Sequence, residues 1–145
     1  MVVNNAGYAL IGAFEACDMA DIRSQFETNV FGLMEVTRAI SPHFRLRQQG
    51  VLINVSSIGG RMTFPLYSPY HGTKWAVDGF SESLQYELRQ FNIKIKIIEP
   101  GAIKTNFYTR STTVAKKAGL TVYDAYSGLR VHGVQLSSKA PFRKR

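Results

Sequence analysis

The sequence of 145 residues contains a single cysteine, Cys17, so it cannot form an internal disulfide. It has no apolar run close to the roughly 20 residues that span a bilayer, and no charged segment followed by an apolar one opens the chain as in a signal peptide. These absences predict a cytoplasmic protein that needs neither oxidation nor a membrane. No neighbour in the sequence would activate the thiol, so we interpret Cys17 as a packing or surface residue.

Acidic residues are also scarce, at 10 against 18 lysines and arginines, which gives a net charge of +8. Half of this charge falls in residues 131–145, a segment without acidic residues that holds Lys139, Arg143, Lys144 and Arg145. Such a tail can contact nucleic acid or anionic lipid, but a solvated, poorly ordered terminus accounts for it as well. We favour the second interpretation and expect no nucleic-acid or membrane partner.

A hydrophobic content of 45% with 19% charged residues indicates a folded domain. Apolar periodicity and β-branched runs predict five elements in order: a strand at 2–3, a helix at 21–48, a strand at 51–57, a helix at 70–91 and a strand at 93–101. This β-α-β-α-β order predicts parallel strands joined by right-handed crossovers. The expected fold class is therefore α/β, with a partial Rossmann-like doubly wound sheet over residues 1–130.

Prolines and glycines predict where these elements end. Pro42 is expected to bend or interrupt the first helix, and Gly50 is expected to end it. Beyond Gly101 the pattern weakens, and short helices are expected near 111–118 and 122–129.

A glycine-rich phosphate-binding turn is missing. The dinucleotide fingerprint G-x-G-x-x-G follows a strand and opens a helix. Gly7 and Gly12 have the wrong spacing, and Gly59 and Gly60 follow a strand without opening a helix. The sequence therefore offers no site for a cofactor pyrophosphate.

Chemistry is indicated by Tyr70 and Lys74, which lie four residues apart on one face of a predicted helix. A free tyrosine has a pKa of about 10, and about 4 kcal/mol of preference for the phenolate would bring that pKa to about 7. A nearby ammonium stabilises the phenolate, and a tyrosine so adjusted can exchange a proton with an alcohol or a carbonyl. Ser57, with Ser56 beside it, ends a predicted strand where ligands bind in open α/β sheets.

Each of these features has an ordinary structural explanation when it is taken alone. A Tyr-x-x-x-Lys pair usually marks a solvated helix face. Asn29, in the middle of a predicted helix, is by default a surface or locally bonded asparagine.

The combination is more specific. Five motifs follow one another in the chain: NNAG at 4–7, ETNVFG at 27–32, INVSS at 53–57, YHGTK at 70–74 and EPGAIKT at 99–105. In order and spacing they resemble those of the short-chain dehydrogenase/reductase (SDR) family, over about residues 1–110. The resemblance implies an oxidoreductase that interconverts a carbonyl and an alcohol with NAD(P)(H), with no indication of NAD or NADP.

The resemblance also implies roles for individual residues. Tyr70 matches the catalytic acid/base, and Lys74 matches the lysine that lowers the tyrosine pKa and binds the nicotinamide ribose. Ser57 matches the serine that orients the substrate oxygen, and Asn29 matches the asparagine that holds a water on the proton relay.

The implied cofactor contacts come from two turns and from the Tyr70–Lys74 pair. The residues of these turns are Asn4, Asn5, Ala6 and Gly7 on the adenosine side, and Pro100, Gly101, Ile103 and Thr105 around the nicotinamide carboxamide.

An alternative remains open because the family's first three strands and its glycine-rich turn have no counterpart here. The chain would then be an inactive SDR fragment that acts at most through protein contacts. In this family the helices corresponding to 21–48 and 70–91 pack against those of a partner subunit, so the resemblance implies a homo-oligomer, and a fragment could still pair with a full-length relative.

Overall fold

The computed structural model describes residues 1–103 and 105–123 of the chain. Its strands are β1 (Val2–Asn4), β2 (Ala9–Ile11), β3 (Gly50–Val55), β4 (Ile93–Ile98) and β5 (Thr112–Val114). Its helices are α1 (Met19–Phe26), α2 (Gly32–Leu46), α3 (Ser68–Leu88) and α4 (Phe107–Arg110). Shorter helical segments are η1 (Phe14–Ala16), η2 (Glu27–Phe31), η3 (Ile58–Gly60), η4 (Arg89–Phe91) and η5 (Thr121–Tyr123).

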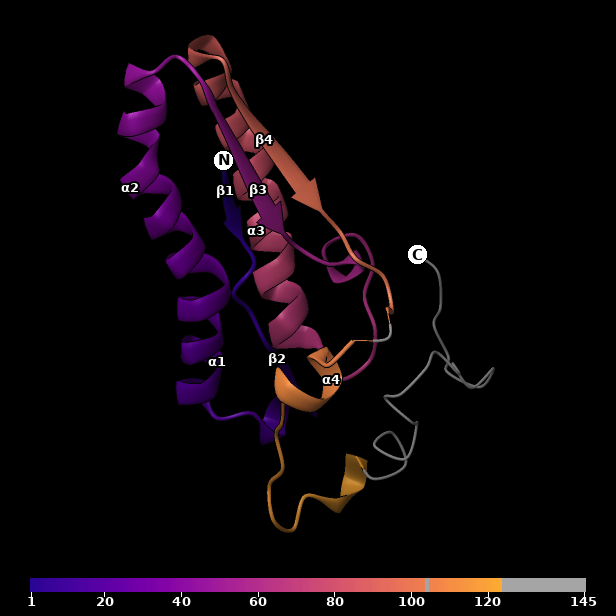
Figure 1. The fold of residues 1–145 in the computed structure, drawn as a ribbon. Helices are drawn as coiled ribbons and strands as arrows, with labels where there is room; N and C mark the ends of the chain where they lie inside the picture. The colour runs from indigo at the N-terminus through magenta and orange to yellow at the C-terminus, as the bar shows by residue number, and fades with distance from the viewer. Residues whose placement is uncertain (104, 124–145) are drawn as a thin grey trace.

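The main sheet contains β1, β3 and β4, all parallel and in that order. One continuous helical rod, made of α1, η2 and α2, precedes β3, and α3 connects β3 to β4 (Figure 1). The predicted α/β class and the β-α-β-α-β order are therefore confirmed.

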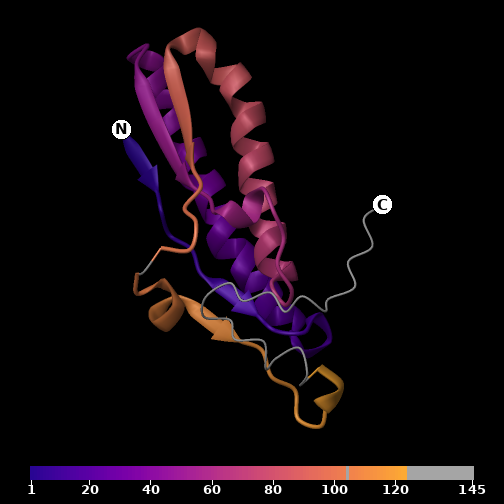
Figure 2. The ribbon, with the colours of Figure 1, turned by 90° about the vertical axis from the view of Figure 1, so that its right-hand side faces the viewer.

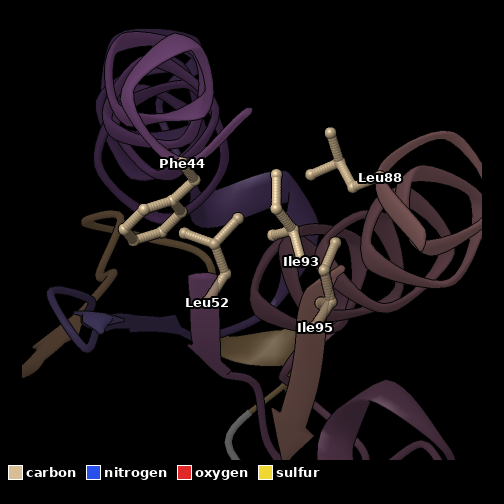
Figure 3. Close-up of a cluster of buried hydrophobic side chains, with 5 residues drawn as sticks. All are labelled: Phe44, Leu52, Leu88, Ile93 and Ile95. Atoms are coloured by element: carbon tan, nitrogen blue, oxygen red, sulfur yellow. The ribbon is translucent and has the colours of Figure 1, made fainter. Parts of the chain in front are cut away.

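The core that joins this sheet to its helices is drawn in Figure 3. Its buried side chains are Phe44 from α2, Leu52 from β3, Leu88 from α3, and Ile93 and Ile95 from β4. Complete burial of one such side chain stabilises the fold by about 1.5–3 kcal/mol. Because α2 and α3 both contribute to this cluster, they pack on the same face of the sheet.

The opposite face of the sheet has no helix among the described residues (Figure 2). Along β4 the side chains alternate, so that Ile93 and Ile95 are buried while Lys94 and Lys96 are exposed. Val3 on β1 is 49% exposed. Period-two alternation of this kind is typical of a sheet that is covered on one side.

The predicted helix at 21–48 is present and Pro42 does not interrupt it, but the prediction that Gly50 ends it is wrong. Pro42 lies inside α2 at an exposed position, where water can bind the backbone carbonyl that the proline leaves without a donor. Gln48 takes the left-handed conformation (φ 49°) after the helix, and Gly50 is the first residue of β3. A Cβ at Gly50 would lie 2.5 Å from the Phe44 ring, so packing rather than a helix cap requires this glycine.

The segment after β4 also differs from expectation. Instead of a helix at 111–118, residues 112–114 form β5, which pairs in parallel with β2 in a second, two-stranded sheet. β2 was not predicted at all, because three residues are too few to show a period. Of the helix predicted at 122–129 only residues 122 and 123, in η5, are described, and the predicted tail at 131–145 lies outside the described residues.

Candidate active site

Three chain segments meet at the carboxyl edge of the main sheet. β1 is followed by the turn at 5–7, β3 by Ser56 and Ser57, and the first turns of α3 carry Tyr70 and Lys74. Pro69 occupies the first turn of α3, where its missing N–H costs no hydrogen bond. Since parallel strands end at the same edge, the topology brings together residues that are up to 70 positions apart in the sequence.

Lys74 is buried, with a relative exposure of 6%. Its Nζ donates a hydrogen bond to the Val55 carbonyl at the end of β3 (3.0 Å) and lies 5.7 Å from the centroid of the Tyr70 ring. Burial lowers the pKa of Lys74 to about 8, and the negative charge of Asp78 opposes this effect. A lysine in this state changes its charge close to physiological pH.

Tyr70 is also buried, and its side chain packs against Ala9 and Ile11 of β2. Burial raises the pKa of its phenol, and a hydrogen bond with the Ser57 hydroxyl lowers that pKa by a smaller amount. The lowered tyrosine pKa that the SDR resemblance implied is therefore not found in the protein alone, because desolvation outweighs the opposing contribution. Ser57 itself accepts a hydrogen bond from the Gly59 N–H (3.0 Å).

Asn29 lies in the π-helical segment η2 and is 2% exposed. Its Oδ1 accepts from the Tyr8 N–H (3.0 Å), and its Nδ2 donates to the Tyr8 carbonyl (2.9 Å) and to Thr73 Oγ1 (3.0 Å). Thr73 Oγ1 in turn donates to the Tyr70 carbonyl (2.8 Å). Asn29 thus connects the segment after β1 to the first turns of α3, and its predicted role in a water relay stays a prediction.

Gly7 lies beside both polar residues. A Cβ at this position would lie 3.2 Å from Asn29 Oδ1 and 3.7 Å from Lys74 Nζ. A side chain here would press on the Asn29 amide and contact the ammonium group, so the close packing favours a glycine at this position. The structure therefore brings Gly7, Asn29 and Lys74 together, as it does Ser57 and Tyr70.

The other predicted cofactor residues are not all directed toward Tyr70 and Lys74. The side chain of Asn4 points into the interior, where its Nδ2 donates to Thr37 Oγ1 (3.2 Å) and Asn54 Oδ1 (2.8 Å). Asn5 and Ala6 are exposed in the turn. The Asn4 side chain is therefore used within the core, and only the Asn4 backbone could contribute to the predicted cofactor turn.

The predicted nicotinamide turn begins next to η3, where the Pro100 carbonyl accepts a hydrogen bond from the Ile58 N–H (3.0 Å). Gly101, Ile103 and Thr105 are exposed, and Thr105 Oγ1 accepts from the Phe107 N–H (3.3 Å). This turn therefore borders the Ser57 segment with its outer side open to solvent.

Two buried polar residues near the site were missed in the sequence. His71 follows Tyr70 directly and bonds two backbone groups of the segment after β3. Asp78 is 4% exposed, and neither of its carboxylate oxygens has a hydrogen-bond partner of good geometry. Burial raises the pKa of Asp78. Asp78 could have been found by continuing the four-residue step from Tyr70 through Lys74, because these positions share one helix face.

The described residues fit one end of a nicotinamide cofactor. An ammonium group has three hydrogens to donate, and the structure gives Lys74 one hydrogen bond within the described chain. The remaining hydrogens suit the hydroxyl groups of a ribose. Within residues 1–103 and 105–123 we find no group of histidine, cysteine, aspartate and glutamate side chains that could hold a metal ion. In the same part of the chain no helix combines the length and the apolar character needed to cross a membrane.

Comparison with known proteins identifies the class to which this fold and site belong. Residues 1–115 match the family model of the short chain dehydrogenases, and the chain belongs to this family. The resemblance found in the sequence is thereby confirmed.

The matched proteins are longer than this chain. An uncharacterized oxidoreductase of Schizosaccharomyces pombe is 50% identical over 107 residues, which cover 74% of this chain and 45% of that protein. A 3-ketodihydrosphingosine reductase of Bacteroides thetaiotaomicron is 36% identical over 130 residues, which cover 90% of this chain and 48% of the reductase. The chain therefore spans about half the length of these relatives.

Solved structures agree with the fold. A short-chain dehydrogenase from Streptomyces avermitilis superposes with a TM-score of 0.75 at 41% identity, over 81% of this chain and 44% of that one. A gluconate 5-dehydrogenase from Burkholderia cenocepacia, in complex with NADP and tartrate, superposes with a TM-score of 0.70 at 27% identity, over 72% of this chain and 41% of that one.

Proposed function

We propose that this chain forms the catalytic part of an NAD(P)-dependent oxidoreductase that interconverts a carbonyl and an alcohol. The observation that carries this proposal is the meeting of the Ser57 hydroxyl with the Tyr70 phenol beside the buried Lys74 ammonium. A solvated helix face, the ordinary explanation for a Tyr-x-x-x-Lys pair, does not fit these burials, because Tyr70 is 7% and Lys74 6% exposed.

Each residue has a distinct task in this proposal. The Ser57 hydroxyl donates a hydrogen bond to the substrate oxygen and holds it against the Tyr70 hydroxyl. Tyr70 gives a proton to that oxygen during reduction and takes it back during oxidation. Lys74 supplies a positive charge that favours the phenolate once its ammonium faces the tyrosine.

The cofactor would supply the hydride acceptor or donor when it is bound. We assign its nicotinamide ribose to Lys74, its adenosine side to the turn that ends at Gly7, and its carboxamide to the turn that starts at Pro100. The described residues contain no glycine-rich turn ahead of a helix, so we assign them no part of the pyrophosphate.

The substrate is proposed to be apolar next to its reacting oxygen. Leu66, Tyr67 and Phe107 pack around the cluster that contains Tyr70, and the Phe107 ring lies 6.2 Å from the Tyr70 ring. A long-chain ketone would find apolar partners at this position. The relative named 3-ketodihydrosphingosine reductase supports a substrate of this kind.

A pair of tyrosine variants tests the reaction. Tyr70→Phe removes the proton donor and is expected to abolish turnover of apolar ketones with NADH or NADPH, followed by the absorbance of the reduced nicotinamide. Tyr67→Phe is the matched control, because its ring lies 6.2 Å from that of Tyr70 and carries the same hydroxyl. Equal loss of activity in both variants, or activity that survives Tyr70→Phe, would contradict the assignment.

We further propose that the chain self-associates through the α1–η2–α2 rod and α3. Large apolar side chains are exposed on both, with Phe31 at 47%, Val36 at 46% and Trp75 at 52%. Trp75→Asp is expected to shift the protein toward a smaller species in sedimentation velocity. Met62→Asp, at a residue that is 49% exposed outside these helices, serves as the control and should leave the sedimentation unchanged. Phe80 is unsuitable for this test because it packs against the buried cluster of Val30, Leu33 and Val77.

A further inference from the structure

His71 bridges two backbone groups of the segment that follows β3. The residue is 5% exposed in the first turns of α3, next to Tyr70. Its Nδ1 lies 2.8 Å from the Gly59 carbonyl oxygen, and its Nε2 lies 2.8 Å from the Phe64 backbone nitrogen. Both ring nitrogens therefore have a partner in one loop, five residues apart.

These two partners define the protonation of the ring. A carbonyl oxygen can only accept, so Nδ1 must carry a hydrogen. A backbone N–H can only donate, so Nε2 must carry none. The contacts thus require the neutral imidazole in its Nδ1–H form, and neither an imidazolium nor the other tautomer satisfies both groups.

The bridged loop carries the residues that the proposed function needs. Gly59 comes two residues after Ser57 and donates its own N–H to the Ser57 hydroxyl. At the other end, the rings of Phe64 and Tyr67 lie 5.5 Å and 5.8 Å from the imidazole. A Cβ at Gly59 would lie 2.9 Å from His71 Nδ1, so the close approach also requires a glycine there.

The same loop contains a residue in an unfavourable backbone conformation. Leu66 has a φ of 68°, in the left-handed region that costs a branched, non-glycine residue about 1–3 kcal/mol. Such a conformation persists only where the surroundings impose it. The Gly12 N–H donates to the Leu66 carbonyl (2.8 Å) at one point, and the two His71 bonds act nearer to Ser57.

We propose that His71 is a positioning residue which, by bridging Gly59 and Phe64, fixes residues 57–67 so that the Ser57 hydroxyl faces Tyr70. His71 does not touch the reacting atoms and acts through Ser57. Its consequence for turnover rests on the proposed function, whereas the placement of Ser57 does not. A histidine that merely fills space would be replaced without effect by a phenylalanine of similar shape.

Three variants separate these two roles. His71→Phe keeps an aromatic ring and removes both hydrogen bonds. In His71→Asn the side-chain amide reaches the position of Nδ1 and can still bond Gly59, whereas in His71→Gln it reaches the position of Nε2 and can still bond Phe64. His43→Phe, at an exposed position of α2, is the control.

The first readout is the pKa of Tyr70, measured by NMR on protein with ¹³C-labelled tyrosine. Because the Ser57 hydrogen bond lowers this pKa, Ser57→Ala is expected to raise it and serves as the reference. His71→Phe should raise it by the same amount, and the double variant should add nothing further. His71→Asn should remain close to the wild type, since the Gly59 bond next to Ser57 survives.

The second readout is hydrogen exchange at the Phe64 amide. We expect exchange about tenfold or more faster in His71→Phe and His71→Asn, because the loss of one hydrogen bond costs about 1.4 kcal/mol. His71→Gln should retain the protection. If His71→Phe does not fold, the ¹⁵N spectrum of the His71 imidazole in the wild-type protein tests the bridge instead. The bridge requires a protonated Nδ1 and an unprotonated Nε2, and this spectrum distinguishes the two tautomers.

The proposal is overturned if folded His71→Phe keeps both the wild-type pKa of Tyr70 and the protection of Phe64, or if the wild-type ring has the other tautomer. None of these readouts needs turnover, so an inactive chain would count against the proposed function alone. With an active enzyme, His71→Phe should lower kcat, and His71→Asn should restore most of it.

Discussion

Replacing Lys74 by methionine tests the electrostatics of the site through the stability of the fold. The pKa of Lys74 falls from 10.5 to about 8 because the ammonium is buried. Between these two values the unfolded chain binds a proton that the folded chain has released. The free energy of unfolding therefore rises with pH over this range, as the folded protein is relieved of a buried charge.

The magnitude follows from the two pKa values. Where one full proton separates the folded from the unfolded chain, the free energy of unfolding changes by about 1.4 kcal/mol per pH unit. Between pH 7 and pH 10 the free energy of unfolding of the wild type should therefore rise by about 2.5 kcal/mol relative to that of Lys74→Met. Burial also raises the pKa of Tyr70, and it raises that of Tyr67 to about 12, which lowers stability above about pH 10. Both proteins contain these tyrosines, so their contribution cancels in the difference.

The assay is urea denaturation followed by circular dichroism at closely spaced pH values. Lys96→Met removes the same charge from an exposed position of β4 and should follow the wild type. If the free energies of unfolding of the wild type and of Lys74→Met change in parallel from pH 8 to pH 10, Lys74 is not desolvated, and the electrostatic account of the site is wrong.

Two further substitutions test the architecture around the site. Asn29→Ala leaves the Tyr8 N–H without its partner, whereas the Tyr8 carbonyl keeps the hydrogen bond from Gln25 Nε2 (3.1 Å), so the free energy of unfolding in urea is expected to fall by about 1–3 kcal/mol; an unchanged denaturation midpoint would mean that water replaces the side chain. Gly60→Ala should lower the melting temperature, because its Cβ would overlap the Asp78 carboxylate. At Gly79, on an exposed helix face, an added Cβ meets open space, so Gly79→Ala should instead raise the free energy of unfolding by about 0.5–1 kcal/mol. Equal effects of Gly60→Ala and Gly79→Ala would refute the packing argument.

The main elements were predictable because their signals are local. The apolar spacing of the helices and the β-branched strands β3 and β4 specify buried faces regardless of what covers them. The pairing of β2 with β5 was not predictable, since each has three residues and gains its hydrogen bonds from a partner about 100 positions away. Gly50 was misread because the Phe44 ring, rather than a helix cap, demands a glycine there.

The positions of the site residues were predictable from the motifs, whereas properties that depend on the surrounding structure were not. The motifs place Ser57, Tyr70 and Lys74 at one sheet edge, and the structure agrees. The direction in which the Tyr70 pKa moves could not be read from them, because it depends on how deeply β2 buries the phenol. His71 was overlooked because its partners, two backbone groups of a loop, leave no trace in the residue types of the motif.

The most direct test of the central claim is a titration with reduced nicotinamide mononucleotide, which carries the end of the cofactor that the described residues fit. Trp75 is the single tryptophan and lies next to Lys74, so it reports on this site. The proposal predicts saturable quenching of Trp75 with energy transfer to the nicotinamide, which Lys74→Met abolishes. Absence of saturable quenching in the folded wild type, or equal quenching in Lys74→Met, would contradict a nicotinamide site at Lys74.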